Sequence, residues 1–211
     1  MLGIFRIQGS PITEGGPALA AYEQGLRLLV GGELAMAVTL VACMGVSYSQ
    51  AASTYGVSYY GVHLDTLWIL ALGFIATSYL LYRSAKSIDP ASPPAGVSLS
   101  LKVLAVGLIA LLLTPYTAGT FFNWTHMIIG ASVFGLQMAV GAILAFKVLA
   151  DRLGWLGLVI EFSGGVLAAL SLPDHMLTCM LQGEIVFQVG FVIILNHLLA
   201  GQIRRIAVES A

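Results

Sequence analysis

The chain has 211 residues, of which 58% are apolar and 9% charged, and its formal net charge is -1. Because soluble domains carry about a quarter charged residues, this composition excludes an ordinary soluble protein and indicates lipid as the solvent. The balanced charge gives no basic patch for nucleic acid, and the two cysteines, Cys43 and Cys179, lack metal-ligand spacing and provide at most one bridge.

Residues 1–25 lack the uninterrupted apolar stretch and cleavage site of a secretory signal. We therefore expect a retained cytoplasmic segment. Proline is favoured at the first position of a helix, so Pro11 and Pro17 predict helix starts at Ser10–Glu14 and at Gly16. An interfacial helix is expected to lead into the first membrane span.

Six apolar runs follow, and each is close to the roughly 20 residues that a membrane helix needs. Segments containing proline separate several of them, at 87–96, 114–120 and 172–174. The sequence therefore predicts an all-α polytopic membrane protein: a six-transmembrane-helix bundle over 26–205 and a cytoplasmic tail over 206–211. The runs are Leu26–Tyr48, His63–Tyr82, Ser98–Thr114, Asn123–Leu149, Leu153–Leu172 and Leu181–Ile203.

Lysine and arginine predict the orientation, since they are retained on the cytoplasmic side. All nine lie at or beyond the same ends of the runs: before or at the start of the first, beside the connection of the second to the third, beside that of the fourth to the fifth, or after the sixth. The other three connections contain none. Six crossings with both termini inside satisfy this pattern, and we expect a multi-pass protein of a bacterial plasma membrane.

Three ionisable residues fall within the inner half of the membrane: Glu33, Glu161 and His197. Counting from neighbouring arginines at 1.5 Å per residue puts each roughly 9–14 Å deep. Burying such groups is costly, so each needs a partner or a function. Three interpretations are open. A glutamate could contact His197 and join the helices, the residues could form a proton or cation site, or their side chains could reach to the membrane interface.

A second polar group is expected at the outer face. Its members could supply ligands for zinc, but no pair has the spacing that puts two ligands on one helical face. The alternative is that these are solvated helix ends, with acids near helix amino-termini. We predict no cofactor. The group comprises His63, Asp65, Asn123, His126, His175 and Glu184.

The fourth run carries a polar and small stripe on one helical face, and Gln137 is its central polar residue. The stripe could pack inside the bundle or line a cavity for an apolar ligand, with Gln137 as the candidate lining residue. Beside it, Ala131, Gly135 and Ala139 form a ridge of small residues that permits close approach of another helix.

The segment 122–134, Phe-Asn-Trp-Thr-His-Met-Ile-Ile-Gly-Ala-Ser-Val-Phe, resembles the fourth-span pattern of the six-helix DRAM-type family, which includes factors that remodel the lipid of GPI anchors. That pattern has an outer histidine followed by a small residue and a phenylalanine. An acidic residue also opens the sixth run. The resemblance implies a membrane factor acting on lipids, with His126 and Glu184 as the matching residues.

Three classes of function fit these features. The first is a non-catalytic membrane protein that binds lipid or serves as an accessory subunit of a membrane complex, with lipids, another membrane protein or a second copy as partners. The second is a small-solute transporter or the substrate-binding subunit of an importer. The third is an outward-facing, metal-dependent lipid hydrolase or transferase.

Overall fold

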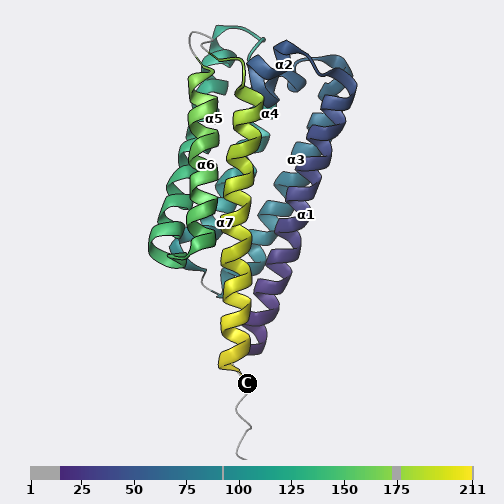
Figure 1. Cartoon of the computed structure of the whole chain (residues 1–211). Helices are drawn as coiled ribbons and strands as arrows, with labels where there is room; N and C mark the ends of the chain where they lie inside the picture. Colours follow the sequence, from purple (N-terminus) through teal and green to yellow (C-terminus); the bar gives the residue numbers. More distant parts are fainter. Residues whose placement is uncertain (1–14, 92, 173–176, 211) are drawn as a thin grey trace, which may run out of the picture.

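A computed structural model describes residues 15–91, 93–172 and 177–210, and every regular element within them is helical (Figure 1). The long helices are α1 (Gly15–Ser47), α3 (Leu64–Ile88), α4 (Val97–Leu113), α5 (Thr120–Ile143), α6 (Arg152–Leu170) and α7 (Met180–Glu209). The short ones are α2 (Gln50–Tyr55), the 3₁₀ turns η1 (Gly56–Gly61), η2 (Asp89–Ala91) and η3 (Pro94–Gly96), and the π-helical η4 (Leu144–Leu149), which continues α5.

Five of these helices are long and apolar enough to cross a membrane: α1, α3, α5 with η4, α6 and α7. The all-helical class is confirmed, and the chain has the helices of a multi-pass membrane protein. The remaining apolar run corresponds to α4, which is apolar but has 17 residues. The helix expected to open at Gly16 is present from Gly15, the first described residue, and the start expected at Ser10–Glu14 lies outside the described residues.

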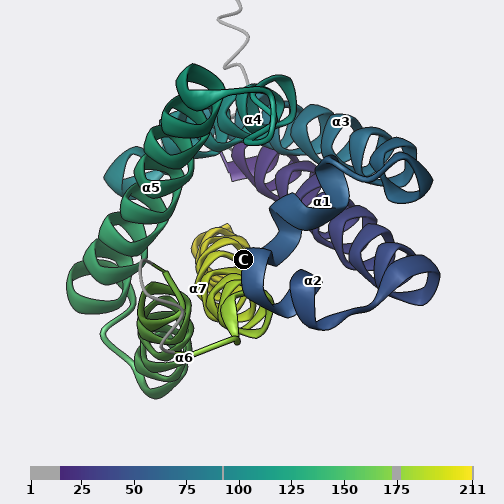
Figure 2. The ribbon, with the colours of Figure 1, turned by 90° about the horizontal axis from the view of Figure 1, so that it is seen from above.

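Viewed from above, α6, α5, α4 and α3 follow one another around an arc, and α7 lies inside it (Figure 2). Helix α1 packs on α3 and on α7, and α7 packs on α6. Two buried apolar clusters fill the bundle. The larger one joins all six long helices around Leu104 and Ile194, and the smaller one lies beneath α2 and η1 around Tyr60.

Helices α6 and α7 form the closest helix pair because glycines allow their backbones to meet. A Cβ atom on Gly164 would lie 2.1 Å from the backbone nitrogen of Phe187, and one on Gly190 would lie 2.2 Å from the backbone nitrogen of Glu161. Small residues permit this kind of contact in membranes, where dispersion and not water exclusion drives helix association. The pair α6–α7 is therefore a rigid support for the side chains that it carries.

Helix α5 is packed less fully than its neighbours. Only Gln137, Val140 and Gly141 of α5 are buried. The ridge expected to receive another helix instead faces outward: Ala131, Gly135 and Ala139 are exposed, and a Cβ on Gly135 would meet nothing within 4 Å. Among the described residues no helix packs on this ridge, because α5 turns the neighbouring face, which carries Gln137, towards α7.

The connection between the first and second long helices is not an open loop. Ser49 caps α2 by accepting a hydrogen bond from the backbone of Ala52, and η1 continues the chain across the end of the bundle. Tyr60 of η1 is fully buried, and this burial raises the pKa of its phenol. The segment thus forms a cap over one end of the helices, visible at the top of Figure 1.

Candidate functional site

The three inner ionisable residues do not form one cluster. Glu33 of α1 accepts hydrogen bonds from the amide of Asn196 on α7, at 3.0 Å to Oε1 and 2.8 Å to Oε2. His197 points elsewhere and does not contact Glu33. The expected Glu to His197 contact is replaced by a carboxylate–amide contact, because Asn196 and His197 are successive residues and project about 100° apart on α7.

His197 binds Asp151, which precedes α6. The ring Nε2 donates to Asp151 Oδ2 at 2.5 Å, and Asp151 also accepts the backbone N–H of Gly154 as the N-cap of α6. These two donors hold the pKa of the Asp151 carboxyl below its ordinary value of 3.8, and the Gly154 N–H has the larger effect. The contact ties the start of α6 to the inner part of α7.

Glu161 has no polar partner in the described chain. Its side chain is fully buried, and neither carboxyl oxygen makes a hydrogen bond. The carboxyl lies against Gly141 of α5, where a Cβ would be only 2.1 Å from Oε2. The inner trio therefore consists of two separate structural contacts and one isolated buried acid.

At the outer end, His126 joins three elements. Its Nδ1 donates to the carbonyl of Thr114 at the end of α4, and its Nε2 accepts from the hydroxyl of Ser58 in η1, both at 2.7 Å. The tautomer follows from the carbonyl, which can only accept. His126 thus holds α5 to the end of α4 and to the cap.

Glu184 of α7 performs a similar role on the other side of the cap. Its Oε2 accepts the backbone N–H of Val57 at 2.7 Å, and a Cβ on Gly56 would collide with the carboxyl at 2.4 Å. Gly56 has a φ of 69°, which also favours glycine. The Glu184 carboxylate therefore occupies space that glycine at position 56 leaves open.

The remaining outer candidates do not join these residues. His63 donates from Nδ1 to the Tyr59 carbonyl, 2.7 Å away, while Asp65 and Asn123 are exposed. His175 lies outside the described residues. In the part of the chain that the structure describes, no three His, Cys, Asp or Glu side chains gather in a way that could hold a metal. Likewise, Cys43 and Cys179 are free thiols.

Gln137 is buried inside the bundle and forms a reciprocal amide pair with Gln188 of α7. Each side-chain amide donates to the carbonyl oxygen of the other, at 3.0 and 3.1 Å. One turn away, the rings of Phe134 and Phe187 stack with centroids 4.3 Å apart. Gln137 therefore joins α5 to α7, as the packing interpretation expects, and it is not among the residues that line the groove between α5 and α6.

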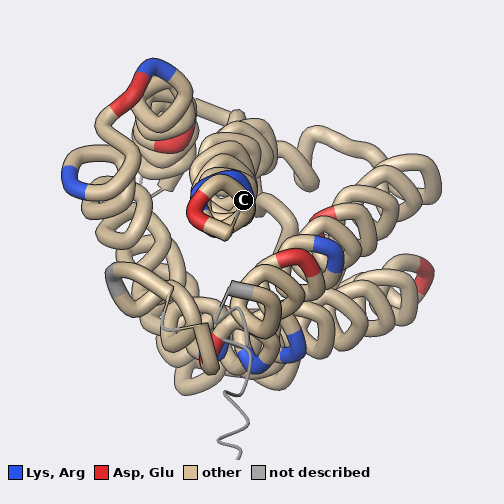
Figure 3. Tube along the Cα trace, turned by 90° about the horizontal axis from the view of Figure 1, so that it is seen from below, with Lys and Arg blue, Asp and Glu red and all other residues tan. Residues whose placement is uncertain are grey.

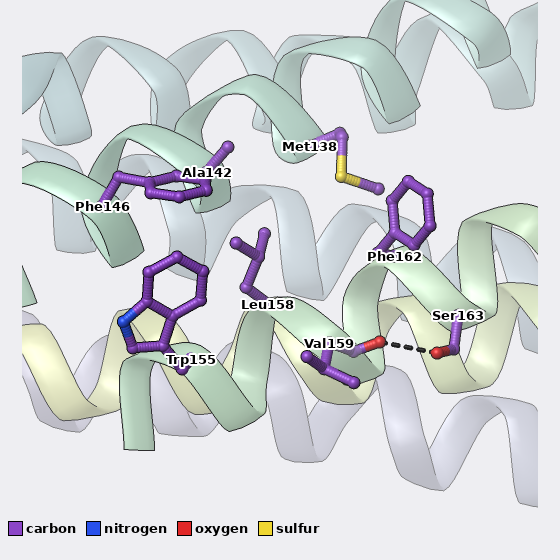
Figure 4. A pocket seen from close by; sticks show the side chains of 8 residues that line it. All are labelled: Met138, Ala142, Phe146, Trp155, Leu158, Val159, Phe162 and Ser163. Atoms are coloured by element: carbon purple, nitrogen blue, oxygen red, sulfur yellow. Dashed lines mark hydrogen bonds between the residues drawn. The ribbon is translucent and has the colours of Figure 1, made fainter. Parts of the chain in front are cut away.

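A groove of about 330 Å³ lies between α5 and α6 (Figure 4). Its walls are almost wholly apolar, and the one hydroxyl, that of Ser163, donates to the Val159 carbonyl on its own helix. Phe146, Val159 and Phe162 are more than half exposed, so the groove opens towards the surroundings of the bundle. The lining residues are Met138, Ala142, Phe146, Trp155, Leu158, Val159, Phe162 and Ser163.

One end of the groove has a basic rim. Phe146 and Trp155 close this end with an edge-to-face contact at 4.5 Å. Lys147 of η4 and Arg152, the first residue of α6, lie on the helix ends beside it, and Arg152 is three residues before Trp155 on the same face of α6. Both side chains are exposed, and among the described residues neither has a carboxylate within salt-bridge distance. Figure 3 looks onto this end of the bundle and shows Lys and Arg on the helix ends around it.

Sequence reasoning did not find this groove. Its large residues are ordinary apolar positions of two helices, and hydrophobicity alone does not tell which of them line a hollow. The available signal was the pair of aromatic residues, Phe146 and Trp155, beside two basic residues in one short connection. Aromatic and basic side chains at a membrane boundary are typical of contact with lipid headgroups.

No protein family model, curated protein or solved structure matches this chain.

Proposed function

We propose that this protein is a multi-pass, non-catalytic membrane protein that binds an anionic phospholipid in the α5–α6 groove, with the headgroup at Lys147 and Arg152. The observation that carries the proposal is the combination of an open apolar groove with an unpaired basic rim at one end. An acyl chain and a phosphate are the two parts of a single ligand that match these surfaces.

The groove suits an acyl chain in size and chemistry. Its volume of about 330 Å³ is at the lower end of the range for small-molecule sites. From Trp155 to Phe162 the α6 wall runs seven residues, or roughly 10 Å. Ser163 has its own acceptor, so among the wall residues the free polar group is the indole N–H of Trp155, at the rim. A polar solute inside the groove would therefore lose its hydration with little compensation, whereas a hydrocarbon chain would not.

The rim suits an anionic headgroup. A basic residue near an anionic leaflet contributes about 1 kcal/mol of attraction, so the two together contribute about 2 kcal/mol, or roughly a 30-fold preference over a neutral lipid. Asp151, the nearest acid in the connection, is occupied by Gly154 and His197. The segment 122–134, through its resemblance to the DRAM-type family, also implies lipid as the substrate or ligand class.

The site would face the cytoplasmic leaflet if the chain crosses the membrane six times with both ends inside. The number of crossings depends on whether α4 spans the membrane. Its 17 residues span roughly 26 Å, close to the hydrocarbon thickness of about 30 Å. The experiment is single-cysteine labelling, in a background with Cys43→Ser and Cys179→Ser, of Ala91→Cys and Ala118→Cys on either side of α4. Six crossings predict labelling of the first only from inside and of the second only from outside; labelling of both from one side contradicts them.

The lipid proposal is tested by native mass spectrometry of protein released from nanodiscs of equal phosphatidylglycerol and phosphatidylcholine. Wild-type protein is expected to retain phosphatidylglycerol, and Lys147→Gln/Arg152→Gln is expected to lose most of that preference. The matched control is Arg83→Gln/Lys86→Gln, which removes two charges from the end of α3. Equal losses in both double variants would show general charge attraction and overturn the site.

A second variant addresses the apolar wall. Ala142→Phe fills the groove without touching the basic rim, so retention of either lipid should fall. If Ala142→Phe binds phosphatidylglycerol as wild type does, the acyl chain does not lie between α5 and α6 and the proposal fails.

A further inference from the structure

Glu161 is the most anomalous residue of the bundle. It lies at the middle of α6, its side chain is 0% exposed, and both carboxyl oxygens lack hydrogen-bond partners among the described residues. Buried carboxylates are normally paired, and an unpaired one in an apolar interior is strongly disfavoured. The lipid site proposed above does not use this residue.

The packing around Glu161 leaves its carboxyl no alternative position. On one side Oε2 lies over Gly141 of α5, at a distance of 2.1 Å from where a Cβ would stand. On the other side the backbone of Glu161 meets Gly190 of α7, with 2.2 Å between that glycine's Cβ position and the Glu161 nitrogen. Glycine at 141 is thus the residue that creates space for this carboxyl.

No charged group on the packed elements compensates the acid. On α5 and η4, His126 is bound to Ser58 and Thr114, and Lys147 lies exposed at the inner end. On α6, Arg152 is nine residues away, or roughly 14 Å.

The ionisable residues of α7 are also engaged elsewhere or distant. Glu184 binds the Val57 N–H, His197 binds Asp151, Arg204 donates to the Ala200 carbonyl, and Arg205 pairs with Glu209. None of them is hydrogen-bonded to Glu161 or forms a salt bridge with it.

Ligand number distinguishes a proton from a metal ion. Calcium takes six to eight oxygen ligands, and magnesium requires near-octahedral coordination. A single carboxyl beside a glycine cannot supply either set, and among the described residues no three acids, histidines or cysteines gather in a way that could hold a metal. A proton needs only the carboxyl itself.

We propose that Glu161 is a reversible proton-binding site, occupied when α5 lies over it and emptied to water when α5 separates from the α6–α7 pair. The step is simple: the carboxyl O–H bond breaks, the proton passes to a water molecule, and the carboxylate remains hydrated. Helix α5 is the element able to move, because α6 and α7 interlock through glycines whereas only three residues of α5 are buried.

The first test uses dicyclohexylcarbodiimide, an apolar reagent that modifies protonated carboxyls, on wild-type protein in detergent, with the modified residue located by mass spectrometry. Glu161 is expected to be modified at neutral pH. The rate of modification should fall about tenfold per pH unit once the pH exceeds the pKa of the Glu161 carboxyl. Glu33, whose carboxyl accepts from Asn196, is the internal control and should react at least tenfold more slowly. Equal modification of both acids, or none at Glu161, overturns the proposal.

The second test needs no reagent access. Because the closed bundle favours the neutral acid, folding stability is complete at low pH and declines as the pH rises. The unfolding temperature of wild type should therefore fall relative to Glu161→Gln, which cannot ionise, as the pH rises above about 4.3, the ordinary glutamate pKa. Parallel profiles for the two proteins would show that Glu161 does not bind and release a proton, whatever the outcome at the lipid groove.

Discussion

The tight pairing of α6 and α7 makes a sharp prediction for two adjacent glycines. Replacing Gly164 with alanine would put a Cβ 2.1 Å from the Phe187 nitrogen and 2.7 Å from the Gly183 carbonyl oxygen. Both are backbone atoms, so the helices must separate. A Cβ on Gly165 would instead meet side-chain carbons, Met138 Cε and Phe187 Cδ2, at 3.3 Å. Those atoms can shift by a few tenths of an ångström.

The magnitude follows from comparing the two variants. Each gains about 0.8–1 kcal/mol of helix propensity when glycine becomes alanine, and this gain cancels in the comparison. Overpacking a core costs about 1–3 kcal/mol, and only Gly164→Ala should incur it in full. We therefore expect Gly164→Ala to be about 1–3 kcal/mol less stable than Gly165→Ala.

The assay is reversible unfolding in mixed dodecylmaltoside and SDS micelles, followed by far-ultraviolet circular dichroism. Wild type and Gly165→Ala should unfold at similar SDS fractions, and Gly164→Ala at a clearly lower one. If Gly164→Ala is as stable as Gly165→Ala, the two helices do not pack through this glycine, and the rigid support assigned to the α6–α7 pair is refuted.

Three further predictions concern single contacts. Gln137→Leu should lower the free energy of unfolding by about 1 kcal/mol because it leaves the Gln188 amide unpaired. Gln137→Leu/Gln188→Leu should lower it by less than the sum of the single changes. Additive losses in SDS unfolding would contradict the pair. The lowered pKa of Asp151 stabilises the fold above its ordinary value of 3.8, and this stabilisation is lost as the pH falls through the lower folded value. The unfolding temperature of wild type should hence drop towards that of Asp151→Asn in acid, and a constant difference would disprove the contact. Finally, Gly141→Ala should destabilise the bundle by about 1 kcal/mol, and adding Glu161→Ala should restore thermal stability; no rescue would mean that the two residues do not touch.

The sequence predicts the helices well because their signal is local. Apolar runs of membrane length and prolines in the connections are properties of short segments, and α5 continued by η4 ends at Leu149, where the fourth run ends. The short α2 and η1 carry no such periodic signal, and only Ser49 as a cap could have indicated them.

The partners of the polar residues were not predictable in the same way. Residue counting gives depth along a helix, but the pairing of His197 with Asp151 and of Glu33 with Asn196 depends on how helices are rotated about their axes. A stripe of polar and small residues shows that one face of a helix differs from the others, but it does not identify the helix that packs against that face. The stripe thus indicated that Gln137 could pack inside the bundle, but it could not identify Gln188 as the partner.

The lipid groove tests the account most directly. A phosphatidylglycerol with a photoactivatable diazirine in its acyl chain would be incorporated into nanodiscs with the protein, irradiated, and located by peptide mass spectrometry. The account predicts crosslinks concentrated on the facing residues of α5 and α6, above all Val159 and Phe162. Crosslinks spread equally over the exposed apolar faces of α1 and α3, around Val38 and Leu72, would show a bulk lipid annulus and contradict a specific site.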